Sequence, residues 1–386
     1  MSHVRLSALL LAAIVAASLN ACGDGKALTD PAPPVGPAAS LSSIVDSVRI
    51  AFNLPAMGTA IVTLEDGIVA IGVAGTRRAA GGPAATAGDL WHLGSNTKAI
   101  TSLLAAVAVS QNRIEWTTTI PQVFPELTNI RAEHRDVTLR ELLSHQSGLQ
   151  GSITPGVLGG WKDLTAVAQR DSVVAWLVQQ PPTGSRGTFV YSNVGYGVAG
   201  AMLERVFGTS FEAATAAHVF APLGMADAGF GPQAAAGSTT QPVGHYREGN
   251  GWRVLENHAI PPVLAPAGSA HMSLPSWGRL VREVLRVEAG TPTLAPAAIA
   301  RETTTEVVPV GPGTSYGLGW GVTTRAWANG KVLYHSGSNG ANFSVAVLAP
   351  QRNVAFLATT NGVDSNGPKA VNGLIGRLIA FHNTGK

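Results

Sequence analysis

The alternation of apolar and polar positions divides the chain into segments of helix and strand character. In residues 41–50 the apolar side chains recur at the spacing of one helix face, which predicts a short helix. Two strand-like runs follow in residues 58–78, and Glu65-Asp66-Gly67 between them indicates a hairpin turn. The run from Ala99 to Val109 is apolar on every side, so we expect a central helix that is buried on every side.

The rest of the chain changes from helix to strand character. From about residue 112 to residue 280 the pattern is mostly helical, with connections rich in Pro and Gly. Strand character returns in SYGLGWGVTTRAW, GKVLYHSG, NFSVAVLAP and NVAFLATTNG, and a helix from about Lys369 to Phe381 follows.

This order of elements restricts the fold class. A doubly wound parallel sheet needs strands and helices that alternate, and this chain lacks that alternation. We therefore predict an α/β fold of the α+β type, with an antiparallel sheet from the N- and C-terminal strands, flanked by helices, plus an all-helical part at about 112–280. Residues 90–110 would lie at the seam between the two parts, where pockets commonly form.

The N-terminal residues have the pattern of an export signal. Arg5 precedes an apolar stretch at 6–19 that is too short to span a membrane, and the segment 1–22 ends in Leu-Asn-Ala-Cys22, similar to a bacterial lipobox. The alternative is a plain signal peptide with an incidental Cys. Residues 23–39 are rich in Gly, Pro and Ala and predict a flexible tether before a domain at 40–384. We expect an exported periplasmic or cell-surface lipoprotein that is lipidated on Cys22 and contacts the membrane only through this anchor.

Composition limits the partners. The 386 residues include 45% hydrophobic ones, which is ample for a large core, and the formal net charge is only +3. The basic residues are scattered, so nothing resembles the basic stripe that nucleic-acid binding requires. Cys22 is the only cysteine, so we expect no disulfide in the mature domain. We expect a monomer.

The segment LWHLGSNTKAITSLLAAVAVS, residues 90–110, places Ser95 three residues before Lys98 at the start of the apolar run. We expect Ser95 to cap this helix. Residues i and i+3 of a helix share a face, with Cβ atoms about 5 to 6 Å apart, so Lys98 can reach the Ser95 hydroxyl. Burial and the helix dipole would lower the pKa of Lys98, and a neutral lysine can activate a serine nucleophile. The alternative is a capping serine beside a solvated lysine.

Two further motifs follow in a recognisable order. They are Tyr191-Ser-Asn193 in PTGSRGTFVYSNVGYGVAG and His335-Ser336-Gly337 in VLYHSGSNGANFS, supported by LRELLSHQSGL, FAPLGMADAGF, APAGSAHMSLPSWGRLV and YGLGWGV. Together with Ser95 and Lys98, they make the chain resemble the serine β-lactamase-like hydrolases, a group that includes class C β-lactamases, DD-carboxypeptidases, D-aminopeptidases and related esterases. The likeness covers roughly residues 40–381 and implies a β-lactamase/transpeptidase-like fold.

The resemblance implies a role for each matching residue. Ser95 would be the acylated nucleophile, Lys98 the neighbouring base, and Tyr191 a second proton-transfer group that later activates water. Asn193 would hydrogen-bond both Lys98 and the amide of the substrate's acyl side chain. The backbone N–H groups of Ser95 and Ser338 would form the oxyanion hole.

The resemblance also implies that His335, Ser336, Gly337 and Ser338 contact the substrate. His335 departs from the class C pattern, in which this position typically holds a lysine opposite the substrate carboxylate. A histidine of ordinary pKa, about 6.5, is mostly neutral at pH 7, which disfavours an efficient β-lactamase. The His-x-Gly form is similar to the DD-carboxypeptidase and D-aminopeptidase branch, although esterases vary here. The Tyr-Ser-Asn motif argues against a class A β-lactamase.

A rival hydrolase pattern lies near the C-terminus. GTSYG at 313–317 fits the G-x-S-x-G nucleophile elbow, with Asp364 and His382 following in α/β-hydrolase order. An elbow needs a strand before it and a helix after it, whereas the strand-like LGWGVTTRAW follows here. We therefore interpret Ser315 as a loop residue.

Metal chemistry has little support in the sequence. There is no H-E-x-x-H motif, and we find no ligand spacing among His92, His134, His145, His218, His245, His258 and His271. We interpret His145, in LLSHQSGL, as a structural residue near the rim of the site. We expect neither a metal nor an organic cofactor, and a small-molecule or peptide substrate as the partner.

These observations predict a serine hydrolase that acts through a Ser95 acyl-enzyme on amide or ester bonds. D-amino-acid peptides, β-lactams and small esters all remain open as substrates. Two alternatives stay in view: a carboxylesterase of the same superfamily, and a penicillin-binding or sensor lipoprotein that is acylated without turnover.

Overall fold

The computed structural model describes residues 41–79 and 81–384. The predicted signal peptide and lipobox at 1–22, with Cys22, and the tether at 23–39 lie outside the described residues and stay predictions. Within the described ranges, no helix combines the length and the apolar character that crossing a bilayer requires.

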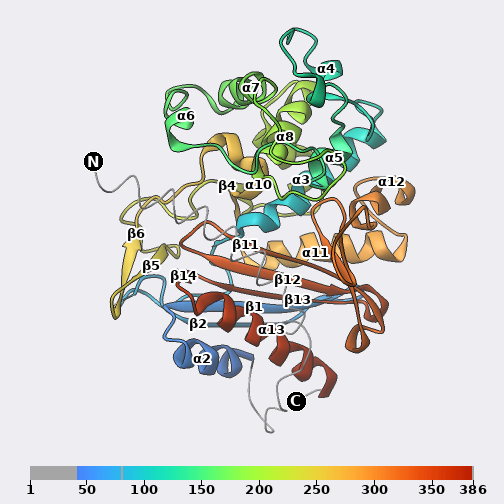
Figure 1. Cartoon of the computed structure of the whole chain (residues 1–386). Helices are drawn as coiled ribbons and strands as arrows, with labels where there is room; N and C mark the ends of the chain where they lie inside the picture. Colours follow the sequence, from blue (N-terminus) through green and yellow to red (C-terminus); the bar gives the residue numbers. More distant parts are fainter. Residues whose placement is uncertain (1–40, 80, 385–386) are drawn as a thin grey trace.

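The centre of the fold is an eight-stranded antiparallel sheet with the strand order β2-β1-β13-β12-β11-β10-β9-β8 (Figure 1). Pairing of β1 with β13 joins the N-terminal hairpin to the C-terminal meander, with Thr59 opposite Ala358. This confirms the predicted antiparallel sheet. In chain order its strands are β1 (Ala56–Thr63), β2 (Gly67–Gly75), β8 (Val308–Gly311), β9 (Thr314–Tyr316), β10 (Gly321–Arg325), β11 (Gly330–Ser338), β12 (Phe343–Ala349) and β13 (Val354–Thr360).

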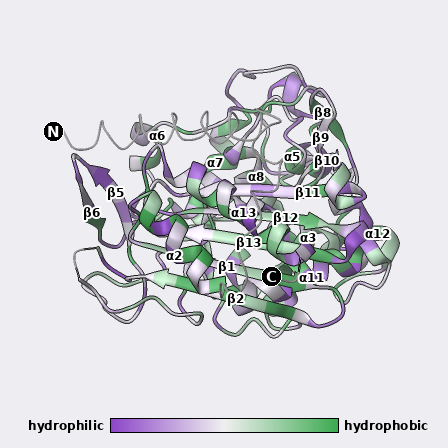
Figure 2. Ribbon diagram, turned by 90° about the horizontal axis from the view of Figure 1, so that it is seen from below, coloured by the Kyte–Doolittle hydropathy of each residue, from purple (hydrophilic) through white to green (hydrophobic). Residues whose placement is uncertain are grey.

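Both faces of this sheet are covered, so its central strands are apolar on both sides. On one face, Met57 and Ile61 of β1 pack with α2 (Leu41–Ala51) and α13 (Gly367–Thr384). Figure 2, which views the molecule from this side, shows the two helices lying across the strands. On the other face, Ala60 of β1 belongs to the larger core, together with α11 (Leu274–Ala289).

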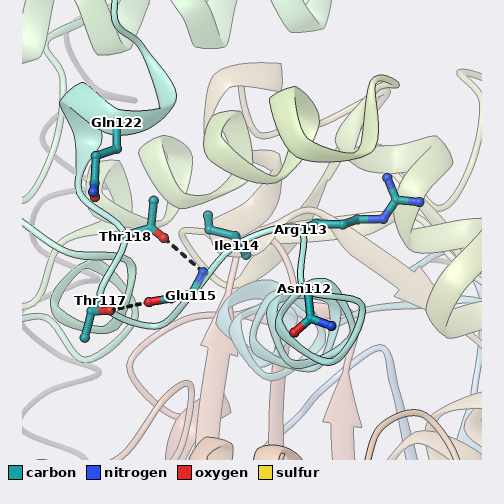
Figure 3. A pocket seen from close by; sticks show the side chains of 7 residues that line it. All are labelled: Asn112, Arg113, Ile114, Glu115, Thr117, Thr118 and Gln122. Carbon is teal, nitrogen blue, oxygen red and sulfur yellow. Dashed lines mark hydrogen bonds between the residues drawn. The ribbon is translucent and has the colours of Figure 1, made fainter.

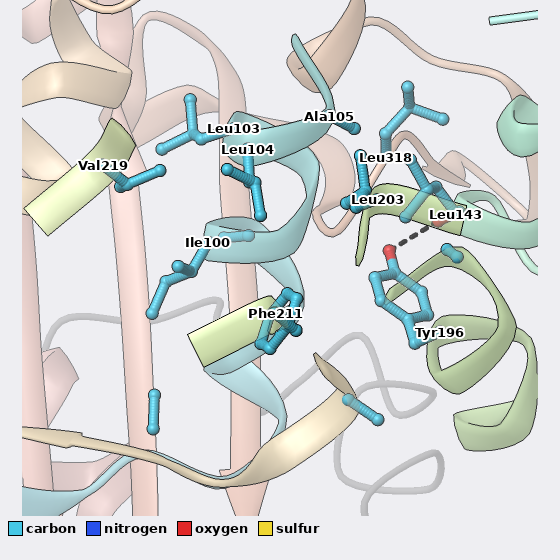
Figure 4. Packing of buried hydrophobic residues seen from close by; sticks show 14 of the residues in the cluster. Ile100, Leu103, Leu104, Ala105, Leu143, Tyr196, Leu203, Phe211, Val219 and Leu318 are labelled. Atoms are coloured by element: carbon cyan, nitrogen blue, oxygen red, sulfur yellow. Dashed lines mark hydrogen bonds between the residues drawn. The ribbon is translucent and has the colours of Figure 1, made fainter. Parts of the chain in front are cut away.

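The helix α3 (Thr97–Ser110) passes through the middle of the larger core. Every residue from Thr97 to Ala108 is buried, which confirms the helix buried on all sides. Figure 4 shows Ile100 and Leu104 of α3 among side chains from several other elements, and the hydroxyl of Tyr196 donating to the carbonyl of Leu143.

The helical part lies above the sheet in Figure 1. Its helices are α4 (Ile120–Val123), α5 (Leu139–Leu143), α6 (Pro155–Gly159), α7 (Ala166–Leu177), α8 (Asn193–Phe207) and α9 (Phe211–Thr215), with the short α10 (Ala265–Gly268) later in the chain; α12 (Ala297–Arg301) follows α11.

The prediction of an all-helical part at about 112–280 is wrong for its last third, which also contains strands. Two small sheets form there, because two adjacent segments pair as a hairpin and other short segments pair with strands that are distant in sequence. One sheet joins β14, β5 and β6, and the other joins β3, β7 and β4. Their strands are β3 (Trp91–His92), β4 (Gly229–Phe230), β5 (Gly244–Glu248), β6 (Gly251–Leu255), β7 (Ala270–Met272) and β14 (Gly362–Val363).

A buried ion group ties the helical part together. Arg170 of α7 is fully buried, and its guanidinium contacts Glu204 of α8 at 2.6 Å and Glu212 of α9 at 2.8 Å. The same guanidinium donates to the carbonyl oxygen of Pro262 at 2.7 Å. Loss of one partner from such a group leaves an uncompensated buried charge, so Arg170 fixes the relative positions of these segments.

We expect Arg170→Met to lower the free energy of unfolding by about 3 to 5 kcal/mol, because Glu204 would remain buried without its cation. Urea unfolding followed by circular dichroism measures this loss. The matched control is Arg131→Met: the Arg131–Glu133 pair is 41% and 44% exposed, so its removal should cost less than about 1 kcal/mol. Equal losses in the two variants would contradict the role of Arg170.

Candidate active site

Ser95 lies in the 3-10 turn η1 (Gly94–Asn96), between β3 and the start of α3. The expectation that Ser95 caps α3 is wrong: the N-cap position belongs to Asn96, and no side chain caps the helix there. Because the Ser95 hydroxyl is not used as a cap, it can face the side chain of Lys98. Ser95 is only partly buried, whereas Lys98 is completely buried.

Polar side chains fix this turn to the sheet. The amide of Asn96 donates to the Ser344 hydroxyl of β12 at 2.8 Å, and that hydroxyl donates to the carbonyl of Leu93 at 2.8 Å. The Thr97 hydroxyl donates to the carbonyl of Gly94 at 2.7 Å. All these side chains are buried, so the nucleophile candidate is carried by a rigid segment.

The end of β11 packs directly against the Ser95 turn. A Cβ atom on Gly337 would lie 2.1 Å from the Leu93 carbonyl oxygen and 2.5 Å from the Ser95 nitrogen. A Cβ atom on Gly94, which has a φ of +52°, would lie 2.3 Å from the Ser338 nitrogen. Only glycine permits this approach, which brings the backbone N–H groups of Ser95 and Ser338 into the same small region.

The amine of Lys98 joins three segments of the chain. Its Nζ atom lies 3.1 Å from Ser95 Oγ and donates to Asn193 Oδ1 and to the carbonyl oxygen of Ala267, each at 2.8 Å. Burial lowers the pKa of Lys98 well below its ordinary value, because the charged form loses its hydration. The structure therefore places a lysine of lowered pKa beside a serine hydroxyl.

Tyr191 and Asn193 reach the site from the start of α8. Ser192 caps this helix, since its hydroxyl accepts from the Gly195 N–H at 2.9 Å and donates to the Gln150 carbonyl at 2.6 Å. The Nζ atom of Lys98 lies 4.7 Å from the centre of the Tyr191 ring. The structure thus brings together four of the residues picked out in the sequence: Ser95, Lys98, Tyr191 and Asn193.

His335 is buried on β11 and is bonded within the protein. Its Nδ1 lies 2.7 Å from the carbonyl oxygen of Ser336, which can only accept, so this nitrogen carries the proton. The Tyr316 hydroxyl then donates to Nε2, 3.0 Å away. Burial, and to a smaller degree the charge of Lys98, lower the pKa of His335 to about 3, so the ring is neutral. The hydroxyl of the neighbouring Ser338 donates to the Asn342 carbonyl in the turn between β11 and β12.

Sequence reasoning missed several residues of this site. His145 is not at the rim: it is fully buried, and its ring centre lies 4.2 Å from that of Tyr191. Tyr316 lies in GTSYG, where the pattern points to the serine, and it begins YGLGWGV, a supporting segment that gives the tyrosine no role. Ala267 acts through its backbone carbonyl, which no motif of side chains reveals, although APAGSAHM was among the segments similar to the family.

The alternative nucleophile elbow is not formed. Ser315 lies within the strand β9 and pairs with Val322 of β10, so the interpretation as a loop residue is wrong, and no helix follows the strand. Asp364 accepts from backbone N–H groups at the start of α13, and the His382 ring packs on Phe356 on the α13 side of the sheet. Asp364 and His382 therefore bind other groups and do not form a catalytic triad with Ser315.

Other parts of the structure offer fewer groups that could take part in a reaction. In the described part of the chain, no three His, Cys, Asp or Glu side chains gather as metal ligands. A hollow of about 380 Å³ lies beyond the other end of α3, lined by polar residues that include Glu115 and Thr118 (Figure 3). The Thr118 hydroxyl there accepts from the Glu115 N–H at 2.9 Å, so these groups already bind each other. The length of α3 separates this hollow from Ser95 by roughly 20 Å.

The structure combines an antiparallel sheet covered by helices with a serine and a buried lysine at the start of a central helix. This combination is typical of a class of serine hydrolases that includes β-lactamases and transpeptidases. A model of the beta-lactamase family matches residues 53–381, and the chain belongs to this family. The family resemblance of the sequence is thereby confirmed.

Known proteins resemble the chain over most of its length. Penicillin-binding protein 4 of Amycolatopsis lactamdurans is 26% identical over 352 residues, which cover 82% of this chain and 83% of that protein. The octameric penicillin-binding protein homologue from Pyrococcus abyssi superposes with a TM-score of 0.70 at 20% identity, covering 90% of this chain and 77% of that one. A D-stereospecific amidohydrolase from a Streptomyces species gives a TM-score of 0.66 at 20% identity, covering 85% and 96%. The structural neighbours support the fold.

We expect Gly337→Ala to lower the free energy of unfolding by about 1 to 3 kcal/mol, because the new methyl group would overlap the backbone of the Ser95 turn. Chemical denaturation measures the change. Gly373→Ala is the matched control: a Cβ atom there meets nothing within 4 Å, and alanine favours the helix α13 by about 0.5 to 1 kcal/mol. A Gly337→Ala variant as stable as the wild type would show that β11 can move away from the turn.

Proposed function

We propose that this protein forms an acyl-enzyme on Ser95 and hydrolyses the amide bonds of D-amino-acid peptides or amides. The observation that carries the proposal is the position of Lys98 Nζ, which is buried and within hydrogen-bond distance of Ser95 Oγ, Asn193 Oδ1 and the Ala267 carbonyl. Asn193 Oδ1 and the carbonyl oxygen can only accept. A neutral amine therefore directs its two protons to them and its lone pair to Ser95.

The first step of the proposed reaction is acylation. Lys98 Nζ takes the proton from Ser95 Oγ as this oxygen attacks the carbonyl carbon of the substrate. The negative charge that develops on the carbonyl oxygen is stabilised by the backbone N–H groups of Ser95 and Ser338. Tyr191, next to Lys98, donates its phenolic proton to the leaving amine and takes in exchange the proton that Lys98 received from Ser95, and the bond between the carbonyl carbon and this amine breaks.

The second step releases the acyl group. A water molecule enters where the amine has left and attacks the ester carbonyl, while one of its protons passes through Tyr191 to Lys98. Lys98 then gives this proton to Ser95 Oγ as the bond between Oγ and the acyl carbon breaks, so the acyl group leaves as a carboxylic acid and the starting state is restored. No step in this sequence draws on a group outside the chain, the substrate and water.

Two observations support D-amino-acid amides over β-lactams. His335 is neutral and bonded to Tyr316, so it supplies no fixed positive charge for a carboxylate such as that of penicillins. In addition, a structural neighbour is named a D-stereospecific amidohydrolase. The name of the relative from Amycolatopsis refers to penicillin binding, which the same acylation chemistry on Ser95 would produce.

We expect Ser95→Ala to abolish acylation, Lys98→Met to slow it by about 10³-fold, and Tyr191→Phe to slow it by about 10²-fold, as losses of the nucleophile and of proton-transfer groups predict. The measurement is the release of p-nitroaniline from N-acetyl-D-alanine p-nitroanilide, with intact mass spectra of the protein recorded in parallel. The L isomer is the matched control and should react at least about tenfold more slowly.

Three other probes separate the alternatives. Turnover of p-nitrophenyl acetate without turnover of the anilide would favour a carboxylesterase. A stoichiometric adduct with benzylpenicillin, without turnover of any probe, would favour a penicillin-binding or sensor protein. An adduct that forms on Ser95→Ala at the wild-type rate would refute the assignment of the nucleophile.

The pH dependence provides a separate test. The proposed base acts only when neutral, so kcat/KM should fall as the pH decreases through the lowered pKa of Lys98. His335, with a pKa of about 3, stays neutral between about pH 5 and 9 and should contribute no step. We therefore expect the pH profile of His335→Gln to keep the shape of the wild-type profile, whatever its height. Disappearance of the acid limb in this variant would show that His335 is the group that titrates.

A further inference from the structure

His145 makes three separate contacts with the segment that carries Tyr191. Its carbonyl oxygen accepts from the N–H of Val190 at 2.8 Å, and its ring Nδ1 accepts from the N–H of Ser192 at 3.0 Å. These are the backbone groups on either side of Tyr191. The His145 ring also lies against the Tyr191 ring, with 4.2 Å between the ring centres.

The backbone of His145 is in an unusual conformation that makes these contacts possible. Its φ is +61°, in the left-handed region that few residues other than glycine adopt, with asparagine, aspartate and histidine the more frequent exceptions. In this conformation both the carbonyl and the ring of one residue face the same segment. A non-glycine residue at positive φ costs about 1 kcal/mol or more, so the fold accepts strain at this position beside the site.

The tautomer of His145 follows from its partners. Because Nδ1 accepts from a backbone N–H, the proton of the neutral ring is on Nε2, and this buried atom has no hydrogen-bond partner in the described part of the chain. Burial, with the charge of Lys98 as a smaller cause, lowers the pKa of His145 well below its ordinary value. The ring is therefore neutral, and it packs between Tyr191, Tyr196 and Tyr316, whose ring centres lie within 5.2 Å.

We infer that His145 is a positioning residue that holds the Tyr191 side chain beside Lys98 for proton transfer. The inference rests on the proposed function: His145 does not contact the substrate, and it affects the reaction only through the proton transfer proposed for Tyr191. Two backbone hydrogen bonds fix the chain on both sides of Tyr191, and the ring contact fixes the direction of its side chain. A displacement of about 1 Å at a proton-transfer group is enough to cost about 10²-fold in rate.

The test is a double-mutant cycle between His145 and Tyr191. We expect His145→Gly to lower kcat/KM for N-acetyl-D-alanine p-nitroanilide by about 10²-fold, mainly through kcat. In the Tyr191→Phe background the same change should lower it by less than about threefold, because the group that His145 positions is already absent. Equal losses in the two backgrounds would overturn the inference.

His145→Asn tests the hydrogen bond separately. Asparagine and glycine both accept a positive φ, but only asparagine places an acceptor where Nδ1 lies, so His145→Asn should recover at least about tenfold of the rate lost in His145→Gly. If His145→Gly does not fold, the cycle is run with His145→Asn, whose smaller loss should likewise vanish in the Tyr191→Phe background. A loss that persists there would overturn the inference.

His134→Asn controls for the loss of a buried histidine. His134 is 1% exposed, and its Nε2 contacts the Gln180 carbonyl at 2.9 Å, away from the site residues. This variant should melt at a lower temperature and keep kcat/KM within about twofold. If the proposed function itself is wrong, the result differs from a failure of the His145 inference: Tyr191→Phe alone would then leave kcat/KM unchanged.

Discussion

The burial of Lys98 is the constraint on which the site depends. An amine buried without water is costly unless its protons and its lone pair have hydrogen-bond partners, and here the partners come from three places: the Ser95 turn, the start of α8 and the carbonyl of Ala267. Each of these segments must therefore reach the same point for the chain to fold. The requirement that stabilises the lysine is the same one that brings the proposed nucleophile and base together.

The sheet supplies the rigid half of this arrangement. Hydrogen bonds from β12 hold the Ser95 turn, and the glycines at 94 and 337 let β11 approach it at backbone contact distance. The apolar faces of β1, β12 and β13 are covered on both sides, so these strands cannot shift independently. As a result, the backbone N–H groups of Ser95 and Ser338 are positioned by the core of the protein and not by a flexible loop.

Local patterns were enough to predict much of this. Alternation of apolar residues indicated the antiparallel sheet and the buried helix α3, and the spacing of Ser95 and Lys98 indicated their contact. What failed depends on contacts between distant segments. The short strand β7 forms by pairing with β3 and β4, which are distant in sequence, and the contacts of Tyr316 and His145 in the site are with residues 19 and 45 to 47 positions away. A positive φ at a histidine leaves no mark in a single sequence.

The helical part supplies the other half of the site, and its own polar core is connected to the chemistry. Arg170 binds Glu204 of α8, the helix that begins at Asn193, and it also binds the carbonyl of Pro262, which lies five residues before Ala267. Both ligands of Lys98 outside the Ser95 turn are thus attached to elements that Arg170 holds. A buried ion group contributes little net stability compared with apolar packing, but it enforces one arrangement. In this protein that arrangement is the one that brings Asn193 and Ala267 to the lysine.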